Sequence, residues 1–165
     1  MIIVNCELPM KNQKTIGLIS DTHGLLRKTA RKALQGVSLI IHAGDIDTPD
    51  VMDELETIAP VAAVRGNMDV IDRVNSLPES DLIEFEGKYF YVLHDLQQMD
   101  LDPAAAGISV VVFGHSHQPA IYNKDGVIYI NPGSAGPKRF KLPISLGRLR
   151  LDNGRIVPEI VELAD

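Results

Sequence analysis

Three short apolar runs in the first half of the chain alternate with segments of helical periodicity. The runs at 15–20, 38–42 and 61–64 have the length of buried strands. The segment 25–35 and the segment that begins at about Pro49 repeat their apolar residues at the spacing of a helix packed on one face. The pattern predicts a β-α-β-α-β order, which requires parallel strands joined by right-handed crossovers.

The second half changes to strand pairs separated by glycine-containing turns. Three hairpins are predicted: 82–86 with 88–93, 120–123 with 127–130, and 144–151 with 155–161. A buried strand at 110–113 lies among them, and weaker periodicity predicts a helix over 97–106. We therefore expect two sheets covered by helices, one sheet mainly parallel and the other mainly antiparallel.

The length of 165 residues suits one domain, with about 70% of the unfolded surface buried on folding. We expect a single domain over 1–165, in which 1–14 form an N-terminal extension that is either disordered or an edge strand. No internal repeat or change in composition divides the chain.

The net charge of −6 argues against stable binding to nucleic acid or to anionic membranes. Cys6 is the single cysteine, so an internal disulfide is excluded and a reducing, cytoplasmic location is expected. The first ten residues lack the basic and apolar regions of a signal peptide, and no run approaches the roughly 20 apolar residues of a membrane span.

Two histidines, His115 and His117, directly follow the strand predicted at 110–113 and the glycine that ends it. In an extended segment, residues two apart point to the same side, so the pair could hold a metal ion. The alternative is a pair of ordinary polar loop residues. The other histidines decide between these interpretations.

Two further histidines, His23 and His94, also lie just beyond predicted strands, whereas His42 lies inside one and is expected to be a core histidine. Carboxylate and amide side chains accompany them, which gives seven candidate ligands at five strand ends: Asp21, His23, Asp45, Asn67, His94, His115 and His117. Ligands converge at the carboxyl ends of parallel strands. Oxygen and imidazole ligands without thiolate suit Mn²⁺, Fe, Zn²⁺, Ni²⁺ or Mg²⁺.

The ordered set Asp21-x-His23, Gly44-Asp45, Gly66-Asn67-x-Asp69, His94 and Gly114-His-x-His117 resembles the calcineurin-like metallophosphoesterase superfamily, over about Thr15 to Leu151. The short chain and the segment Asn131-Pro132-Gly133-Ser134 are similar to its small bacterial and archaeal phosphodiesterase branch. The resemblance implies an α/β (α+β) fold: a four-layer αββα sandwich of two mixed β-sheets flanked by helices.

The resemblance also implies a dinuclear metal centre. One ion would be held by Asp21, His23, Asp45 and His117, and the other by Asp45, Asn67, His94 and His115, with Asp45 bridging. Asn67 and Asp69 would take part in catalysis, Asp69 by orienting a ligand or solvent molecule. The implied reaction is hydrolysis of a P–O bond in a small phosphodiester by a metal-bridging hydroxide. Mn²⁺ is the preferred ion, with Ni, Fe, Zn or Mg as alternatives.

Two positions depart from the pattern of the family. Met68 stands where many larger members have a proton-donating histidine, and its side chain is expected to pack. Asp95 replaces the glycine usual after His94, which affects the expected backbone and pocket shape there. The basic residues Lys138 and Arg139, with Lys141, form either a solvated face or part of a substrate site.

The sequence leaves two alternatives to the phosphodiesterase prediction and one possible partner open. The same centre would serve a phosphomonoesterase or nucleotide phosphatase. A non-catalytic protein-interaction scaffold could use the same fold, although a scaffold is expected to lose ligands. An exposed strand edge could support a homodimer.

Overall fold

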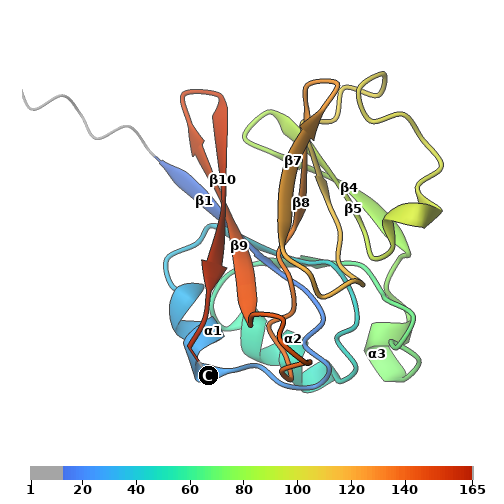
Figure 1. The fold of residues 1–165 in the computed structure, drawn as a ribbon, viewed down its shortest axis with the longest axis vertical. Helices are drawn as coiled ribbons and strands as arrows, with labels where there is room; N and C mark the ends of the chain where they lie inside the picture. Colours follow the sequence, from blue (N-terminus) through green and yellow to red (C-terminus); the bar gives the residue numbers. More distant parts are fainter. Residues whose placement is uncertain (1–12, 165) are drawn as a thin grey trace, which may run out of the picture.

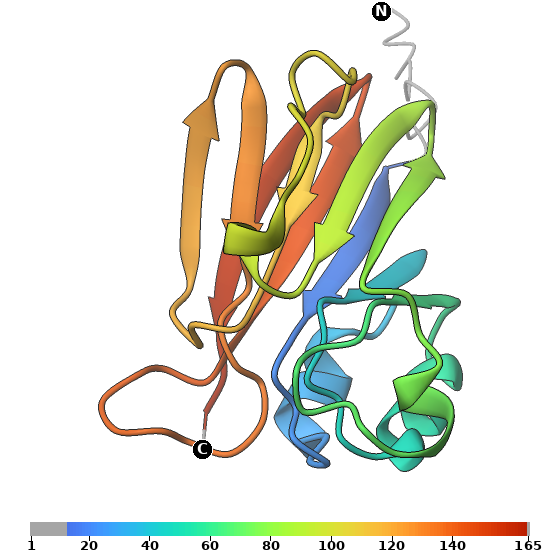
Figure 2. The ribbon, with the colours of Figure 1, turned by 90° about the vertical axis from the view of Figure 1, so that its right-hand side faces the viewer.

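A computed structural model describes residues 13–164, which form two five-stranded sheets packed face to face (Figure 1, Figure 2). The first sheet has the order β10-β9-β1-β2-β3, with β1 (Lys14–Ile19), β2 (Leu39–His42), β3 (Val61–Ala63), β9 (Ser145–Asp152) and β10 (Arg155–Glu162). The second has the order β4-β5-β6-β8-β7, with β4 (Ser80–Phe85), β5 (Lys88–Leu93), β6 (Val110–Val112), β7 (Ala120–Lys124) and β8 (Val127–Asn131).

Both sheets are mixed. In the first, β1, β2 and β3 are parallel, whereas β9 pairs antiparallel with both β1 and β10. In the second, β5, β6 and β8 are parallel, whereas β4 and β7 pair antiparallel at its edges. The expectation of one mainly parallel and one mainly antiparallel sheet was therefore wrong, because each predicted hairpin adds its strands to a parallel core.

Side chains alternate between two apolar layers along the central strands. Ile16 and Leu18 of β1 lie in the layer between the sheets, where they meet Phe90 and Val92 of β5 and Val110 of β6. Ile19 lies with the helices on the opposite face of the first sheet. Continuous apolar runs are expected for strands covered on both faces.

Three helices accompany the first sheet, namely α1 (Lys28–Ala33), α2 (Pro49–Glu56) and α3 (Asp72–Asn75). Val51, Met52 and Leu55 of α2 are buried, as the predicted spacing required. Helix α1 is shorter than the predicted 25–35, because the backbone is still extended at Arg27 and the helix begins at the next residue. The four-residue helix α3 was not predicted, since one turn carries too little periodicity to detect.

The helix predicted over 97–106 was wrong. The segment holds a single 3-10 turn, η1 (Leu96–Gln98), and then irregular turns. Pro103 lacks an N–H, and the Asp102 carboxylate caps a local turn by accepting from Ala104 N and Ala105 N at 3.1 and 3.3 Å. The apolar side chains still cover the second sheet, where Leu96, Met99 and Leu101 pack on its outer face.

The predicted fold class is confirmed as a two-sheet sandwich with few helices. Within residues 13–164, no helix is both long and apolar enough to cross a membrane. Most of the predicted extension, residues 1–12 of 1–14, lies outside the described residues, and β1 already begins at Lys14. The helices and the turns after β1, β2 and β3 gather at one end, away from the tight turns that join β7 to β8 and β9 to β10 (Figure 1).

Candidate metal centre

All seven predicted ligands lie in turns that follow strands of the two sheets. Backbone hydrogen bonds join these turns: Asp21 N and His23 N donate to Gly44 O and Asp45 O, both at 3.0 Å. In the second sheet, Gly114 N donates to His94 O at 3.0 Å. The turns from each sheet are thus held as pairs, and their side chains face one another.

The ligand turns contain an unusual backbone conformation. Five predicted ligands have positive φ angles: Asp21 (53°), His23 (45°), Asp45 (56°), His115 (71°) and His117 (59°). Non-glycine residues rarely adopt this left-handed region, and such strain concentrates at functional sites. The sequence argument that His115 and His117 share a side of an extended segment was therefore wrong, since the chain turns at both residues.

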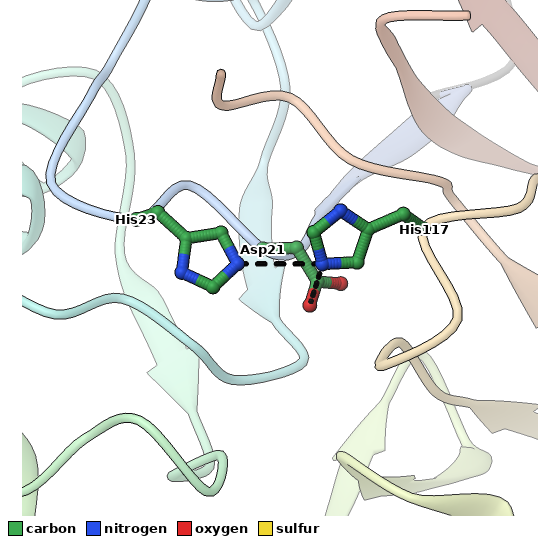
Figure 3. Close-up of side chains that lie close together, drawn as sticks. All are labelled: Asp21, His23 and His117. Carbon is green, nitrogen blue, oxygen red and sulfur yellow. Dashed lines mark hydrogen bonds and ion pairs between the residues drawn. The ribbon is translucent and has the colours of Figure 1, made fainter. Parts of the chain in front are cut away.

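A first cluster consists of Asp21, His23 and His117, which point toward one another (Figure 3). His117 Nε2 lies 3.2 Å from Asp21 Oδ1 and 3.3 Å from His23 Nε2. Asp21 and His117 are buried, and the side chain of His23 is 9% exposed. Three ligand atoms therefore converge on one small volume.

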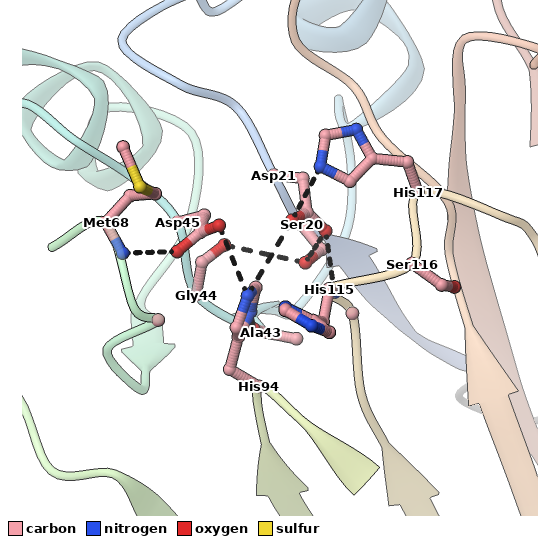
Figure 4. Close-up of polar contacts among 12 residues, drawn as sticks. Ser20, Asp21, Ala43, Gly44, Asp45, Met68, His94, His115, Ser116 and His117 are labelled. Atoms are coloured by element: carbon pink, nitrogen blue, oxygen red, sulfur yellow. Dashed lines mark hydrogen bonds and ion pairs between the residues drawn. The ribbon is translucent and has the colours of Figure 1, made fainter. Parts of the chain in front are cut away.

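A second cluster consists of Asp21, Asp45 and His94 (Figure 4). His94 Nε2 lies 3.3 Å from Asp45 Oδ2 and 3.9 Å from Asp21 Oδ1. The same Asp45 oxygen lies 3.9 Å from His23 Nε2. Both carboxylates consequently reach toward histidines of both clusters, so the two clusters form one continuous site.

Each central carboxylate is anchored through one oxygen and presents the other. Asp21 Oδ2 accepts from Ser20 Oγ at 2.6 Å and from His115 N at 3.2 Å. Asp45 Oδ1 accepts from Met68 N at 2.9 Å. Their remaining oxygens, Asp21 Oδ1 and Asp45 Oδ2, are those that face the histidines. The oxygens therefore have fixed directions before any ligand binds.

Several buried polar atoms of the site lack hydrogen-bond partners, as expected for ligands of a cation. Among residues 13–164, Asp21 Oδ1, His94 Nε2 and His117 Nδ1 are buried without a hydrogen-bond partner of good geometry. Unpaired polar atoms are costly in a protein interior. Carboxylate oxygens and imidazole nitrogens at these distances are the donor set of a divalent transition metal. Asp21, Asp45, His23, His94 and His117 could hold such ions.

The remaining two predicted ligands, His115 and Asn67, lie at the rim of the site. Both are exposed, and the His115 ring centre is 5.2 Å from that of His94. Together with His94 they line a cavity of about 300 Å³. His115 and His117 therefore face different parts of the centre.

Polar residues make up much of the remaining wall of this cavity. Arg65 lines it and pairs with Glu79 at 2.6 Å. Asp95 also lines it, with ordinary extended dihedral angles, and its carboxylate accepts from Gln97 N at 3.0 Å. The replacement of glycine at this position thus needs no backbone distortion. A small polar group of a substrate would find hydrogen-bond partners in the cavity.

Asp69 connects two of the ligand turns. The carboxylate is buried and accepts three backbone N–H groups: Ile46 N at 2.8 Å, Asp47 N at 2.7 Å and Gly66 N at 2.8 Å. Burial raises the pKa of Asp69, and the three hydrogen bonds oppose that rise. Asp69 therefore positions the turns that carry Asp45 and Asn67.

His94 and Asp45 each stabilise the charged form of the other side chain. Burial alone lowers the pKa of His94, but its contact with Asp45 raises the pKa above the ordinary value. Burial alone raises the pKa of Asp45, but the contacts with His94 and the Met68 N–H lower it. The site thus attracts positive charge, which a proton on His94 or a metal ion can supply.

His42 is a core histidine, as expected. Gly44 N donates to His42 Nδ1 at 3.1 Å, so the proton lies on Nε2, which is 3.0 Å from Thr22 Oγ1. Burial is the main cause that lowers the pKa of His42 from 6.5 to about 3. The imidazole is therefore neutral and positions the turn that carries Asp45.

Sequence reasoning missed Asp47, and it singled out the segment from Asn131 to Ser134 without predicting that its side chains position the ligands. Asp47 Oδ2 lies 3.3 Å from His23 Nδ1, and Ser134 Oγ donates to Asp21 O at 2.9 Å. Asn131 Nδ2 donates to Gly114 O at 2.9 Å, so the segment from Asn131 to Ser134 supports two ligand turns. Asp47 could have been found from the sequence, because it lies two residues after the predicted ligand Asp45. The contacts of Ser134 and Asn131 depend on tertiary structure.

Glycine is required where these turns approach one another. A Cβ at Gly66 would collide with Asp45, and one at Gly114 would collide with Ser20 and Asp21. Met68 was expected to pack, but its side chain is 50% exposed, so that prediction was wrong. Its contribution to the site is the backbone N–H that anchors Asp45.

Comparison with known proteins gives a consistent result. A model of the calcineurin-like phosphoesterase superfamily domain matches residues 15–154. A probable metallophosphoesterase of Methanothermobacter thermautotrophicus is 37% identical over 158 residues, covering 88% of this chain and 91% of that protein.

Solved structures show the same architecture. An archaeal phosphodiesterase superposes with a TM-score of 0.70 at 26% identity, covering 89% of this chain and 99% of the other. Vacuolar protein sorting 29 of Cryptosporidium parvum superposes with a TM-score of 0.72 at 17% identity, covering 93% and 99%. The second likeness concerns the fold alone.

The neutral state of His42 makes folding stability depend on pH. The unfolded chain binds a proton at His42 below pH 6.5, whereas the folded protein does so only near pH 3. Stability from this group is therefore complete above pH 6.5 and falls as the pH drops toward 3, by roughly 1.4 kcal/mol per pH unit. Urea unfolding of the metal-free protein at pH 7 and pH 5 should show a smaller decline for His42→Gln than for wild type. Equal declines would contradict this account.

Proposed function

The chain belongs to the calcineurin-like phosphoesterase superfamily, and on that premise we propose that it is a metal-dependent phosphodiesterase with a dinuclear centre. The observation that carries the proposal is the pair of merged clusters around Asp21 and Asp45, in which the carboxylates present free oxygens to three buried or nearly buried histidines. An archaeal protein of solved structure is named a phosphodiesterase, which supports the choice of a diester.

The proposed ligand sets follow the sequence prediction. One ion would be held by Asp21, His23, Asp45 and His117, and the other by Asp45, Asn67, His94 and His115. Asp45 is the proposed shared ligand, because its Oδ2 faces both His23 and His94. Asp21 Oδ1 also lies near His117 and His94, so Asp21 is the alternative shared ligand.

When bound, two divalent ions would supply Lewis acidity toward the phosphate and an activated water as nucleophile. The protein orients the ligands through Ser20, Met68, Asp47 and Asp69, so little reorganisation is needed during reaction. Asn67 and His115 at the cavity rim are placed to contact the substrate side of the centre. Asp69 acts in catalysis by holding the turns of Asp45 and Asn67.

The proposed substrate is a small phosphodiester in the cytoplasm, with Mn²⁺ as the preferred ion. Support for a small substrate comes from the cavity of about 300 Å³ beside His94. The net charge of −6 speaks against nucleic acid. We propose a single domain over 1–165, which the family match to 15–154 supports for that part of the chain. A homodimer through an exposed strand edge stays a prediction.

A protein-interaction scaffold is the second candidate, because the fold also resembles vacuolar protein sorting 29. The filled ligand positions favour the enzyme. Titration of the metal-free protein with Mn²⁺ tests the enzyme, which should bind ions at micromolar concentrations. Failure to bind would favour the scaffold.

Replacing the proposed shared ligand tests the centre directly. Asp45→Ala should lower kcat/KM for an aryl phosphodiester by about 10²–10³-fold or more, because both ions lose a ligand. Asp50→Ala is a matched control, since Asp50 is an exposed aspartate at the start of α2. Full turnover by Asp45→Ala would refute the shared-ligand assignment.

Substrate preference separates the two enzyme candidates. In Mn²⁺, the wild-type protein should hydrolyse an aryl phosphodiester with a higher kcat/KM than the corresponding monoester. The paired assay uses the same leaving group, so its pKa does not contribute to the difference. A preference for the monoester would instead indicate a phosphomonoesterase or nucleotide phosphatase.

The absence of a proton donor at Met68 leads to a gain-of-function prediction. Met68 N anchors Asp45 through the backbone, so Met68→His should leave that contact intact. The new imidazole should raise the rate for diesters with poor leaving groups, by about 10-fold or more where protonation limits the rate. Activated aryl diesters serve as the control, and their rates should change little. An equal change for both substrates would argue against general-acid catalysis from position 68.

A further inference from the structure

The connection between β8 and β9 carries basic residues that the proposed chemistry does not use. Its first part is fixed to the turn that holds Asp21, through Ala135 N, which donates to Ser20 O at 3.1 Å. Arg27 Nε donates to Gly136 O at 3.1 Å, and a Cβ at Gly136 would collide with the backbone of that turn. The residues that follow therefore start from a rigid base beside the first ligand cluster.

Arg139 extends from this base to the metal centre. Its Nη2 lies 3.5 Å from His23 Nε2, the same nitrogen that lies 3.3 Å from His117 Nε2 and 3.9 Å from Asp45 Oδ2. Asp47 Oδ2 faces His23 Nδ1, which favours the proton on Nδ1 and the lone pair on Nε2. A guanidinium group only donates. Arg139 thus points at the lone pair that an ion would use.

The environment of Arg139 differs from that of the arginines that form ion pairs with carboxylates. Arg31, Arg65 and Arg73 each pair with a carboxylate, at 2.6, 2.6 and 3.0 Å. Arg139 makes no ion pair within the part of the chain that the structure describes, and its recorded side-chain contact is an imidazole. Its cation is therefore available to an anionic ligand.

The local backbone holds Arg139 in a tight turn. Leu142 N donates to Arg139 O at 3.1 Å, and Phe140 between them has a φ of 52°. The left-handed conformation is costly for a bulky residue, and the Phe140 side chain is 94% exposed, so packing does not compensate. The strained turn at Phe140 therefore fixes the course of the backbone directly after Arg139.

We propose that Arg139 binds a phosphoryl oxygen of the substrate, next to the ion held by His23. The proposal rests on the proposed metallophosphoesterase function. The Nε2 lone pair of His23 cannot serve an ion and Arg139 together, so metal binding leaves the guanidinium without its acceptor and beside a new positive charge. A phosphoryl oxygen between the two cations satisfies both. The planar guanidinium fork suits phosphate particularly well.

This arrangement couples metal and phosphate binding. Without an anion, Arg139 competes with the ion for the site around His23. With phosphate present, Arg139 supports the complex that contains both ligands. Binding linkage is reciprocal, so phosphate should strengthen Mn²⁺ binding by the same factor by which Mn²⁺ strengthens phosphate binding. Removing the Arg139 cation should reduce that factor.

The test measures inorganic phosphate binding to the full-length, Mn²⁺-loaded protein by titration calorimetry. Arg139→Gln should weaken phosphate binding by about 10- to 100-fold, the loss expected for a charge-assisted hydrogen bond. Mn²⁺ affinity without phosphate should stay equal or become tighter in this variant. The phosphate affinity of Arg139→Lys should lie between those of the wild type and Arg139→Gln, because lysine keeps the positive charge but lacks the planar guanidinium group.

Lys141→Gln is the matched control, since it removes one exposed cation from the same connection. Its phosphate affinity should stay within about two-fold of wild type. An equal loss of phosphate affinity in both variants, or unchanged phosphate affinity in Arg139→Gln, would overturn the role of Arg139. Hydrolysis by the wild-type protein would then still support the proposed function. Wild-type protein that binds no Mn²⁺ and hydrolyses no ester would overturn the proposed function and this inference together.

Discussion

The concentration of electron-rich atoms in one buried volume is the constraint on which the site depends. Asp21 Oδ1 and Asp45 Oδ2 face the nitrogens of His94 and His117 at 3.2 to 3.9 Å. Such atoms repel one another unless positive charge lies between them. The backbone resists the arrangement as well, since the ligand turns adopt left-handed conformations. Burial, strain and repulsion together favour a bound cation as the stable state.

The surrounding structure provides the rigidity that this arrangement requires. Asp69 connects the turns after β2 and β3 through three backbone amides. Asn131 and Ser134 perform a similar role between the sheets, where they hold the turns of Gly114 and Asp21. Neutral His42 completes the support from inside the first sheet. Ligand direction is therefore set by hydrogen bonds among non-ligand residues.

The sequence was sufficient to predict the strands and the order of ligand-bearing turns, because apolar runs ending in Asp, His or Asn are local signals. It failed at the 97–106 helix, where Asp102 and Pro103 favoured turns. It also missed the positive φ angles at His115 and His117, since Cβ-bearing residues adopt them only when tertiary contacts compensate. The support from Asp47 and Ser134 depends on contacts between distant segments, which periodicity cannot reveal.

The first cluster joins residues from opposite sheets, because His23 follows β1 and His117 follows β6, 94 positions later. An ion held there would be a reversible crosslink between the sheets, and it would stabilise the folded state because only the folded chain brings these ligands together. The two sheets could then separate only after releasing the ion. Resistance to proteolysis and the rate of unfolding would consequently follow the availability of metal in the cell, so that metal starvation would shorten the lifetime of the protein itself.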